Sequence, residues 1–135
     1  MAATHVLLLT AVLPRRADTT AVIGTALQAS ARGIGYRRIA AQLERPASTV
    51  HRWIRALRDD HHLDWLGEQG IQRIAQVDRE VLTTLAAQPT RLAEALTALA
   101  AAAVTVHTRL APHVPVWTLI GQFTHGRLIT PANTG

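Results

Sequence analysis

Two short apolar stripes, separated by only three residues, constrain the fold of this chain more than any other feature. Their apolar residues recur at intervals of three and four: Ile39, Ala40 and Leu43, then Val50, Trp53, Ile54 and Leu57. These intervals predict two helices with one buried face each, the first starting near Tyr36 and the second near Pro46 or Ala47. Only Glu44, Arg45 and Pro46 lie between them, so the connection is a sharp turn. Because the second helix is basic, the pair is expected to read the DNA major groove.

The residues of this pair resemble a known motif. Tyr36-Arg37-Arg38-Ile39-Ala40-Ala41-Gln42-Leu43 and Ser48-Thr49-Val50-His51-Arg52-Trp53-Ile54-Arg55 are similar to the helix-turn-helix of bacterial transposases and site-specific recombinases. More loosely, residues 4–8, 13–16 and 126–128 resemble a group of actinobacterial helix-turn-helix proteins, in which a Cys-rich ribbon usually precedes the motif. This chain has no Cys. Either the ribbon has been lost, or the sequence is a truncated reading of a longer gene.

Two positions depart from the pattern of that family. Glu44 stands where the family usually has Gly, at a position that favours positive φ. A Glu there is expected to cost about 1 kcal/mol. Pro46 stands where the family often has a Ser or Thr that caps the second helix, and Pro has no side-chain group that can cap.

The charge of the chain is concentrated around the motif. All fourteen basic residues are Arg, which is explained better by coding bias than by selection for phosphate binding, because Arg also occurs outside the motif. Residues 1–58 hold nine Arg and two acids, a net charge of +7, whereas residues 59–135 hold five Arg and seven acids, a net charge of −2. This asymmetry is the electrostatic pattern of a DNA-binding unit.

If the second helix enters the major groove, its first turns face the bases. The residues predicted to read bases are Ala47, Ser48, His51, Arg52 and Arg55. The residues predicted to contact phosphate are Tyr36, Arg37, Arg38, Thr49 and Arg58. For each Arg, the alternative is an ordinary solvated face. Trp53 is predicted to lie in the core, because its spacing from Val50 and Leu57 points it inward.

The Ala-rich and Leu-rich composition favours an all-α fold: a three-helix helix-turn-helix unit followed by an α-helical hairpin. Residues 1–17 are predicted to be an apolar N-terminal arm, a buried strand or a helix, because their apolar run 1–13 is too short to span a membrane and lacks the cationic start of a signal peptide. An export signal is the minor alternative. We therefore expect a cytoplasmic, nucleoid-associated protein that does not bind membranes. Asp18 is expected to open the first helix, capped by Asp18 or Thr19 and ended by Gly33, so that residues 18–58 make the DNA-binding unit.

Residues 59–70 are predicted to be a linker. The run Asp59-Asp60-His61-His62-Leu63-Asp64 resembles a metal cluster, but adjacent His residues point to different faces, so a solvated segment is favoured over a metal site. Gly67 and Gly70 are expected to mark a break before the second half of the chain.

Residues 71–124 are predicted to contain a helical hairpin and a short final helix, with a tail at 125–135. The first helix of the hairpin runs from Ile71 to about Ala87, and a short turn at Gln88-Pro89 leads to the second. The second helix carries a heptad-like seam of apolar residues: Leu92, Leu96, Leu99, Ala103, Val106 and Leu110. The seam is expected to pack within the hairpin. A homodimer through Leu92, Leu96, Leu99, Val106 and Leu110 is the alternative, and the two can coexist.

No catalytic constellation is found, so we predict no enzyme activity, no metal and no cofactor. The acids lack the mixed sheet on which strand-transfer enzymes hold two metal ions. The function expected is sequence-specific binding of double-stranded DNA, as a small transcriptional regulator or a recognition fragment derived from a transposase. The alternative is an assembly protein that does not bind DNA and docks a partner through the hairpin at 71–110.

Overall fold

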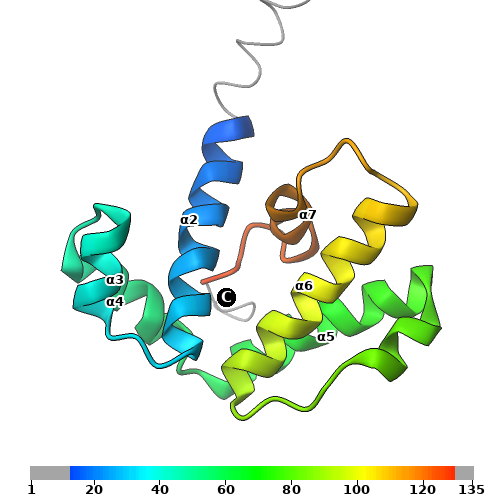
Figure 1. Cartoon of the computed structure of the whole chain (residues 1–135), viewed down its shortest axis with the longest axis horizontal. Helices are drawn as coiled ribbons and strands as arrows, with labels where there is room; N and C mark the ends of the chain where they lie inside the picture. The colour runs from blue at the N-terminus through cyan, green and yellow to red at the C-terminus, as the bar shows by residue number, and fades with distance from the viewer. Residues whose placement is uncertain (1–12, 130–135) are drawn as a thin grey trace, which may run out of the picture.

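The computed structural model describes residues 13–129, and these residues are all-α, which confirms the predicted fold class (Figure 1). The helices in chain order are α2 (Leu13–Ala31), α3 (Tyr36–Leu43), α4 (Ala47–Ala56), α5 (Asp60–Val77), the 3-10 helix η1 (Arg79–Thr84), α6 (Arg91–Arg109) and α7 (Val116–Phe123). One continuous cluster of buried side chains, from Ile23 to Leu128, joins them.

Helix α2 is the central element, and it packs on both halves of the molecule (Figure 1). It contacts α3 and α4 on one side, and α6 and α7 on the other. Ala26 and Leu27 on this helix are completely buried. A Cβ atom placed on Gly24 would lie 2.1 Å from atoms of the Trp117 ring, so the absence of a side chain lets α7 pack closely on α2.

The start of α2 differs from the prediction, and its end agrees. The helix begins at Leu13, before Asp18, so Asp18 and Thr19 are not its caps. Pro14 lies in the first turn, where a residue without an N–H group is tolerated. Of the predicted apolar arm, residues 1–12 lie outside the described residues, and 13–17 belong to α2. As predicted, Gly33 ends the helix region, with a φ of 91°.

The predicted linker at 59–70 is wrong, because all but its first residue belongs to α5. Asp59 caps this helix by accepting a hydrogen bond from the backbone N–H of His61 (3.0 Å). His62 is only 2% exposed, and its Nε2 donates to the carbonyl oxygen of Leu128 at 3.0 Å. Within the described residues its other ring nitrogen, Nδ1, is buried without a hydrogen-bond partner. Of the polar residues that suggested a linker, Asp59 caps the helix and His62 lies inside the fold, while Asp60, His61 and Asp64 lie exposed on the helix surface.

The predicted antiparallel hairpin is also wrong: α5 and α6 run parallel. The N-terminal ends of the two helices meet where Arg91 pairs with Asp64, and their C-terminal ends meet where Arg109 pairs with Asp78. The thirteen residues 78–90, between Val77 and Arg91, return the chain to the start of α5. At about 3.3 Å per residue they can span the roughly 27 Å length of an 18-residue helix. We call residues 78–90 the return segment.

The return segment exists because α5 stops at Val77, ten residues before the predicted end. Asp78 has extended backbone angles (φ −159°, ψ 96°). Its side chain accepts from the N–H of Glu80 at 3.1 Å, which starts η1, and it also pairs with Arg109. These contacts favour a cap at Asp78 over continuation of the helix. Beyond η1 the chain is extended at Leu85, so the predicted turn at Gln88-Pro89 is part of a longer connection.

Gly67 and Gly70 do not break the chain; they lie inside α5, and Gly70 lies where α5 crosses α6. A Cβ atom on Gly70 would lie 2.6 Å from the carbonyl carbon of Ala98 and 2.9 Å from the backbone nitrogen of Leu99. A Cβ on Gly67 would make only an ordinary contact, 3.9 Å from the Cα of Ala95. Gly70 thus lets the two helix backbones approach closely, which outweighs its low helix propensity.

The predicted seam on α6 packs inside the chain. Its residues Leu96, Leu99, Ala103 and Val106 are buried, Leu92 is half-buried, and only Leu110, the C-cap of α6, is exposed. Because the other elements already cover this face, the structure does not support a homodimer through the seam. The predicted tail also differs, since Leu128 is buried over α5, and residues 130–135 lie outside the described residues.

Candidate nucleic-acid interface

Helices α3 and α4 form the helix-turn-helix that the apolar stripes predict. They begin at Tyr36 and Ala47, as expected. The inner faces are buried against α2: Ile39 and Ala40 from α3, and Val50 and Trp53 from α4. Trp53 is 8% exposed, which confirms that it belongs to the core.

The turn between the two helices contains the strained residue that the sequence indicated. Glu44 adopts the left-handed conformation, with φ 54° and ψ 46°. The backbone N–H of Glu44 donates to the carbonyl oxygen of Ala41 (3.4 Å) and that of Arg45 donates to the carbonyl oxygen of Ala40 (3.0 Å), so these two carbonyl groups in the last turn of α3 are satisfied. A residue with a Cβ atom pays about 1 kcal/mol for this conformation. The strain is therefore located at the entrance to α4.

The N-terminus of α4 has no side-chain cap, as expected for Pro46. The carbonyl oxygen of Pro46 accepts the N–H groups of Thr49 (3.1 Å) and Val50 (3.2 Å). The N–H groups of Ala47 and Ser48 in the first turn make no hydrogen bond within the described chain. Free N–H groups at the positive end of a helix dipole favour an anion such as a phosphate group.

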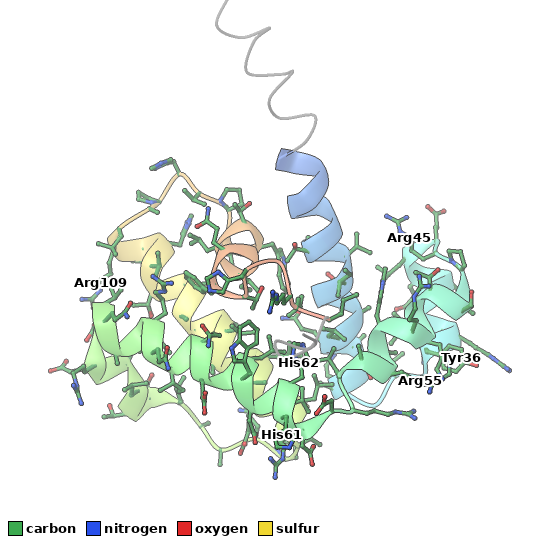
Figure 2. The ribbon with its side chains drawn as sticks, turned by 180° about the vertical axis from the view of Figure 1, so that it is seen from behind. Tyr36, Arg45, Arg55, His61, His62 and Arg109 are labelled. Carbon is green, nitrogen blue, oxygen red and sulfur yellow. The ribbon has the colours of Figure 1, made fainter. Side chains whose placement is uncertain are left out.

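The predicted base-reading residues lie on the outer face of α4. Ala47, Ser48, Arg52 and Arg55 are exposed, whereas His51 is half-buried. Of the predicted phosphate contacts, Arg37, Arg38 and Arg58 are exposed, and Tyr36 and Thr49 are half-buried. Figure 2 shows that Tyr36, Arg45 and Arg55 lie together at the end of the molecule formed by α3 and α4, far from Arg109.

Three of these residues, Tyr36, Arg37 and His51, contact one another through their side chains. The ring of His51 on α4 lies 4.5 Å from the ring of Tyr36 on α3, measured between centroids, with the planes tilted by 31°. The guanidinium carbon of Arg37 lies 5.6 Å from the centroid of the same Tyr36 ring. Such aromatic and cation–π contacts stabilise a geometry. His51 is thus less free to extend toward a base than Ser48 or Arg52.

The arginines of α3 and α4 have no acidic partner among the described residues, unlike the two arginines of α6. Arg91 forms a bidentate pair with Asp64 (3.0 and 3.1 Å) and lies 3.8 Å from Asp60, and Arg109 pairs with Asp78. The positive charge of the first half therefore stays available to a ligand.

Arg45 is a basic residue of this surface that the sequence analysis did not select. It lies exposed in the turn directly before α4, and like its neighbours it has no acidic partner among residues 13–129. Its position one residue before Pro46, at the start of the predicted reading helix, was the signal that could have identified it.

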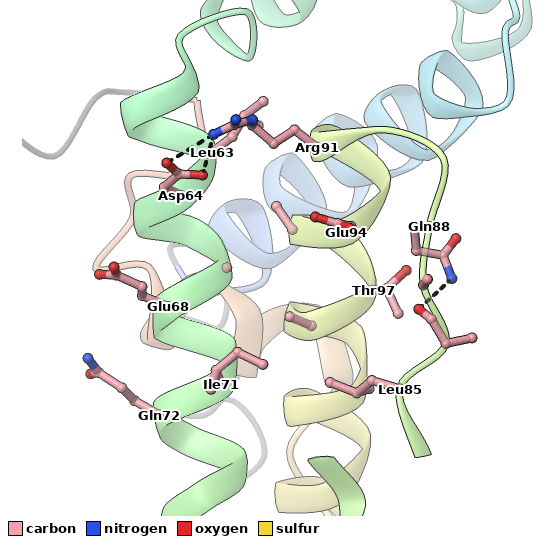
Figure 3. Close-up of a pocket in the computed structure, with 15 residues that line it drawn as sticks. Leu63, Asp64, Glu68, Ile71, Gln72, Leu85, Gln88, Arg91, Glu94 and Thr97 are labelled. Carbon is pink, nitrogen blue, oxygen red and sulfur yellow. Dashed lines mark hydrogen bonds and ion pairs between the residues drawn. The ribbon is translucent and has the colours of Figure 1, made fainter. Parts of the chain in front are cut away.

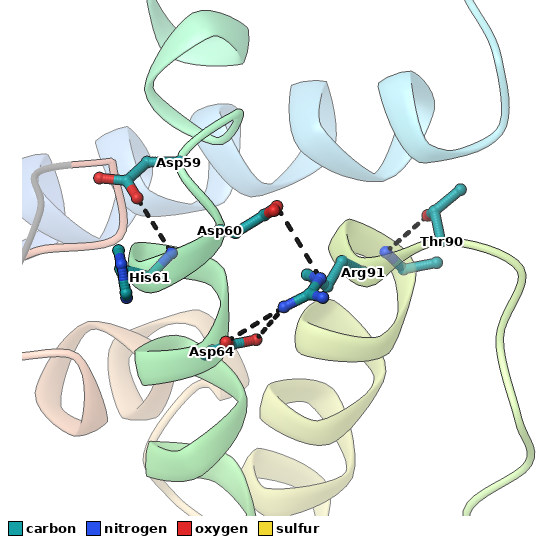
Figure 4. Close-up of polar contacts among 7 residues, drawn as sticks. Asp59, Asp60, His61, Asp64, Thr90 and Arg91 are labelled. Atoms are coloured by element: carbon teal, nitrogen blue, oxygen red, sulfur yellow. Dashed lines mark hydrogen bonds and ion pairs between the residues drawn. The ribbon is translucent and has the colours of Figure 1, made fainter.

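The Asp and His residues at the start of α5 do not converge on one point (Figure 4). Asp59 caps the helix, Asp60 and Asp64 face Arg91, and His62 is buried under Leu128. Within the described residues, no group of three or more His, Cys, Asp or Glu side chains could hold a metal ion. Among the same residues, every helix is too short or too polar to cross a membrane.

Comparison with known proteins agrees with this geometry. The family model of the homeodomain-like domain matches residues 19–61. This range covers most of α2, all of α3 and α4, and the first two residues of α5. Neither the curated proteins nor the solved structures contain a match to this chain. Residues 19–61 are therefore similar to a homeodomain-like domain, and α3 and α4 within them form a helix-turn-helix.

Proposed function

We propose that this protein binds double-stranded DNA sequence-specifically, by inserting α4 into the major groove. The observation that carries the proposal is the basic outer face of α3 and α4, whose arginines have no acidic partner among the described residues. A helix-turn-helix whose second helix leaves such a face exposed has the shape and the charge that the major groove accepts.

Different residues have different tasks in this proposal. Arg52 forks to the N7 and O6 atoms of a guanine, Ser48 donates to or accepts from a base edge, and Ala47 contacts a thymine methyl group. Arg37, Arg38, Arg45 and Arg58 contact phosphates and fix the register of the helix on DNA. His51 and Tyr36 support the angle between α3 and α4, since their rings are in contact.

The biological role that fits is that of a small transcriptional regulator or of a recognition fragment derived from a transposase, acting in the cytoplasm on the nucleoid. The proposal includes no catalysis, and no metal or cofactor. The alternative is an assembly protein that does not bind DNA, and it is the conclusion to draw if no duplex binds.

The test begins with selection of bound duplexes from a random pool, using the full chain. Arg52→Ala is then titrated against the selected duplex and a random one at one fixed salt concentration. We expect it to lose about 1–3 kcal/mol on the selected duplex and little on the random one. Equal losses on both would make Arg52 a phosphate contact.

Arg79→Ala is the matched control for that experiment. Arg79 is exposed in η1, in the acidic half of the chain, and forms no ion pair within the described residues. Arg73 is less suitable, because its guanidinium carbon lies 4.9 Å from the ring centroid of the buried Phe123. A larger loss from Arg79→Ala than from Arg52→Ala would move the DNA surface away from α4 and contradict the proposal.

A further inference from the structure

A groove lies between α5 and the return segment, with α6 as its floor (Figure 3). It has a volume of about 640 Å³. The groove exists because α5 and α6 run parallel, so that the returning chain forms a third wall beside them. It lies on the other side of α2 from α3 and α4 (Figure 1), and an occupant would not compete with DNA for the same surface.

The middle of the groove is apolar and lacks a partner. Ile71 from α5 and Leu85 from the return segment point toward each other from opposite walls (Figure 3). Ile71 is 39% exposed, although it is a large aliphatic residue on a helix that buries its other apolar residues well. The buried residues Leu63, Ala95 and Ala98 complete the apolar lining. An aliphatic side chain placed between Ile71 and Leu85 would remove both from water.

The polar residues of the groove are net negative. Asp64 is neutralised by Arg91, but Glu94 on α6 and Glu68 on α5 have no ion pair among residues 13–129. Glu94 extends from the floor (Figure 3). A cationic side chain is therefore the complementary partner at this point of the groove.

One wall of the groove offers unpaired backbone groups. Leu85 is extended, with φ −73° and ψ 120°. The backbone N–H groups of Ala86, Ala87 and Gln88 form no hydrogen bond within the described chain, while the carbonyl of Ala86 accepts from the Gln88 side chain at 3.2 Å. An extended peptide can pair with such an edge through its own backbone.

The groove is open rather than enclosed, because more than half of its lining residues are exposed to solvent. Small-molecule sites bury most of the surface of their ligand. An open trough with an extended wall, a central apolar gap and an unpaired acid suits a peptide better.

We propose that this groove docks an extended segment of a partner protein, one that carries aliphatic side chains and at least one Arg or Lys. An aliphatic side chain enters between Ile71 and Leu85, and the cation pairs with Glu94. The protein would then bind DNA through α4 and hold a partner on the far side of α2.

The test selects random dodecapeptides, displayed on phage, against the immobilised full chain. A recovered sequence is synthesised with a fluorescent label, and its affinity is measured by anisotropy. We expect recovered sequences to combine Leu, Ile or Val with Arg or Lys. Ile71→Ser should weaken binding at least tenfold, while Val104→Ser leaves it unchanged, because Val104 is an exposed aliphatic residue on α6 outside the groove (53% exposed).

A charge reversal tests the ionic contact separately. Glu94→Arg should weaken the basic peptide at least tenfold and restore binding of a matched peptide in which Glu replaces the Arg or Lys. Glu80→Arg, an exposed acid outside the groove, is the control. Thermal melting and circular dichroism of every variant show whether the fold is intact, and if Ile71→Ser is unfolded the charge reversal decides alone.

Three results would overturn the proposal. One is the recovery of no sequence above a blank surface. Another is an equal loss of binding from Ile71→Ser and Val104→Ser. The last is a dimer in sedimentation that Ile71→Ser dissociates, which would assign the groove to a second copy of this chain. None of these results depends on whether the chain binds DNA.

Discussion

The two regions that flank α2 use their arginines in opposite ways. In the α5–α6 pair, Arg91 faces Asp60 and Asp64 of α5, and Arg109 faces Asp78, the residue directly after α5. In the α3–α4 pair, the arginines face solvent, and the N-terminus of α4 is left without a side-chain cap. The two arginines of α6 are thus paired within the fold, whereas those of the α3–α4 pair remain available to an anionic ligand. This difference supports the proposed DNA surface on α3 and α4 more specifically than the overall charge does.

The two regions nevertheless share one core, and Trp53→Ala tests whether they unfold together. Trp53 is buried in the continuous apolar cluster, so its loss should destabilise the fold by roughly 3–5 kcal/mol. Because the cluster is continuous, we expect the whole chain to melt in one transition at a lower temperature. Circular dichroism and differential scanning calorimetry measure this. Two separate transitions, with the upper one unchanged, would mean that α5 and α6 are stable without the helix-turn-helix.

The close crossing of the second region is tested by two glycines three residues apart. Gly70→Ala forces a Cβ to within 2.6–2.9 Å of the α6 backbone, and we expect it to destabilise the fold by about 1–3 kcal/mol. Gly67→Ala meets only an ordinary contact at 3.9 Å, so higher helix propensity should stabilise the fold by up to about 1 kcal/mol. Urea unfolding measures both. Equal effects would contradict the close approach of the α5 and α6 backbones at Gly70.

The opposite use of arginine is tested by Arg38→Ala and Arg109→Ala. Arg38 is exposed and makes no ion pair with the described residues, so its removal should change stability by less than roughly 0.5 kcal/mol. It should also reduce the slope of the log of DNA affinity against the log of salt concentration by about 0.9. Removing Arg109 leaves the largely buried Asp78 unpaired, and we expect about 1 kcal/mol of destabilisation with no change in the salt slope. If both variants changed the salt slope equally, the two regions would not differ in the way described.

The smallest expected effect concerns Glu44, at the entrance to α4. Glu44→Gly should stabilise the fold by about 0.5–1 kcal/mol, because Gly adopts φ 54° without strain. Glu44→Ala removes the same negative charge and keeps the strain, so it serves as the control. Melting curves compare their stabilities, and titration with DNA should show a similar small gain in affinity for both. Equal stability of the two variants would show that backbone strain at Glu44 is negligible.

The sequence alone predicted the helix-turn-helix, because its signals are local. Apolar residues three and four apart define the inner faces of α3 and α4 whatever lies behind them. Likewise, a three-residue connection permits only a sharp turn. The buried Trp53 followed from the same spacing, whereas the left-handed Glu44 was expected from the resemblance to a family that usually has Gly at this position. The roles of individual residues on DNA remain predictions, since they depend on a ligand as well as on the chain.

Only the tertiary structure decided what surrounds that motif, because the deciding contacts join residues far apart in the chain. From the sequence alone, the run from Asp59 to Gly70 was predicted to be a linker. In the structure the ring of His62 donates a hydrogen bond to Leu128, 66 residues away in the chain, and the close backbone of α6 leaves room only for a glycine at position 70. The parallel direction of α6 is fixed by Arg91 on Asp64 and by Arg109 on Asp78. Periodicity specifies which face of a helix is buried, but not the direction or the identity of the helix that buries it.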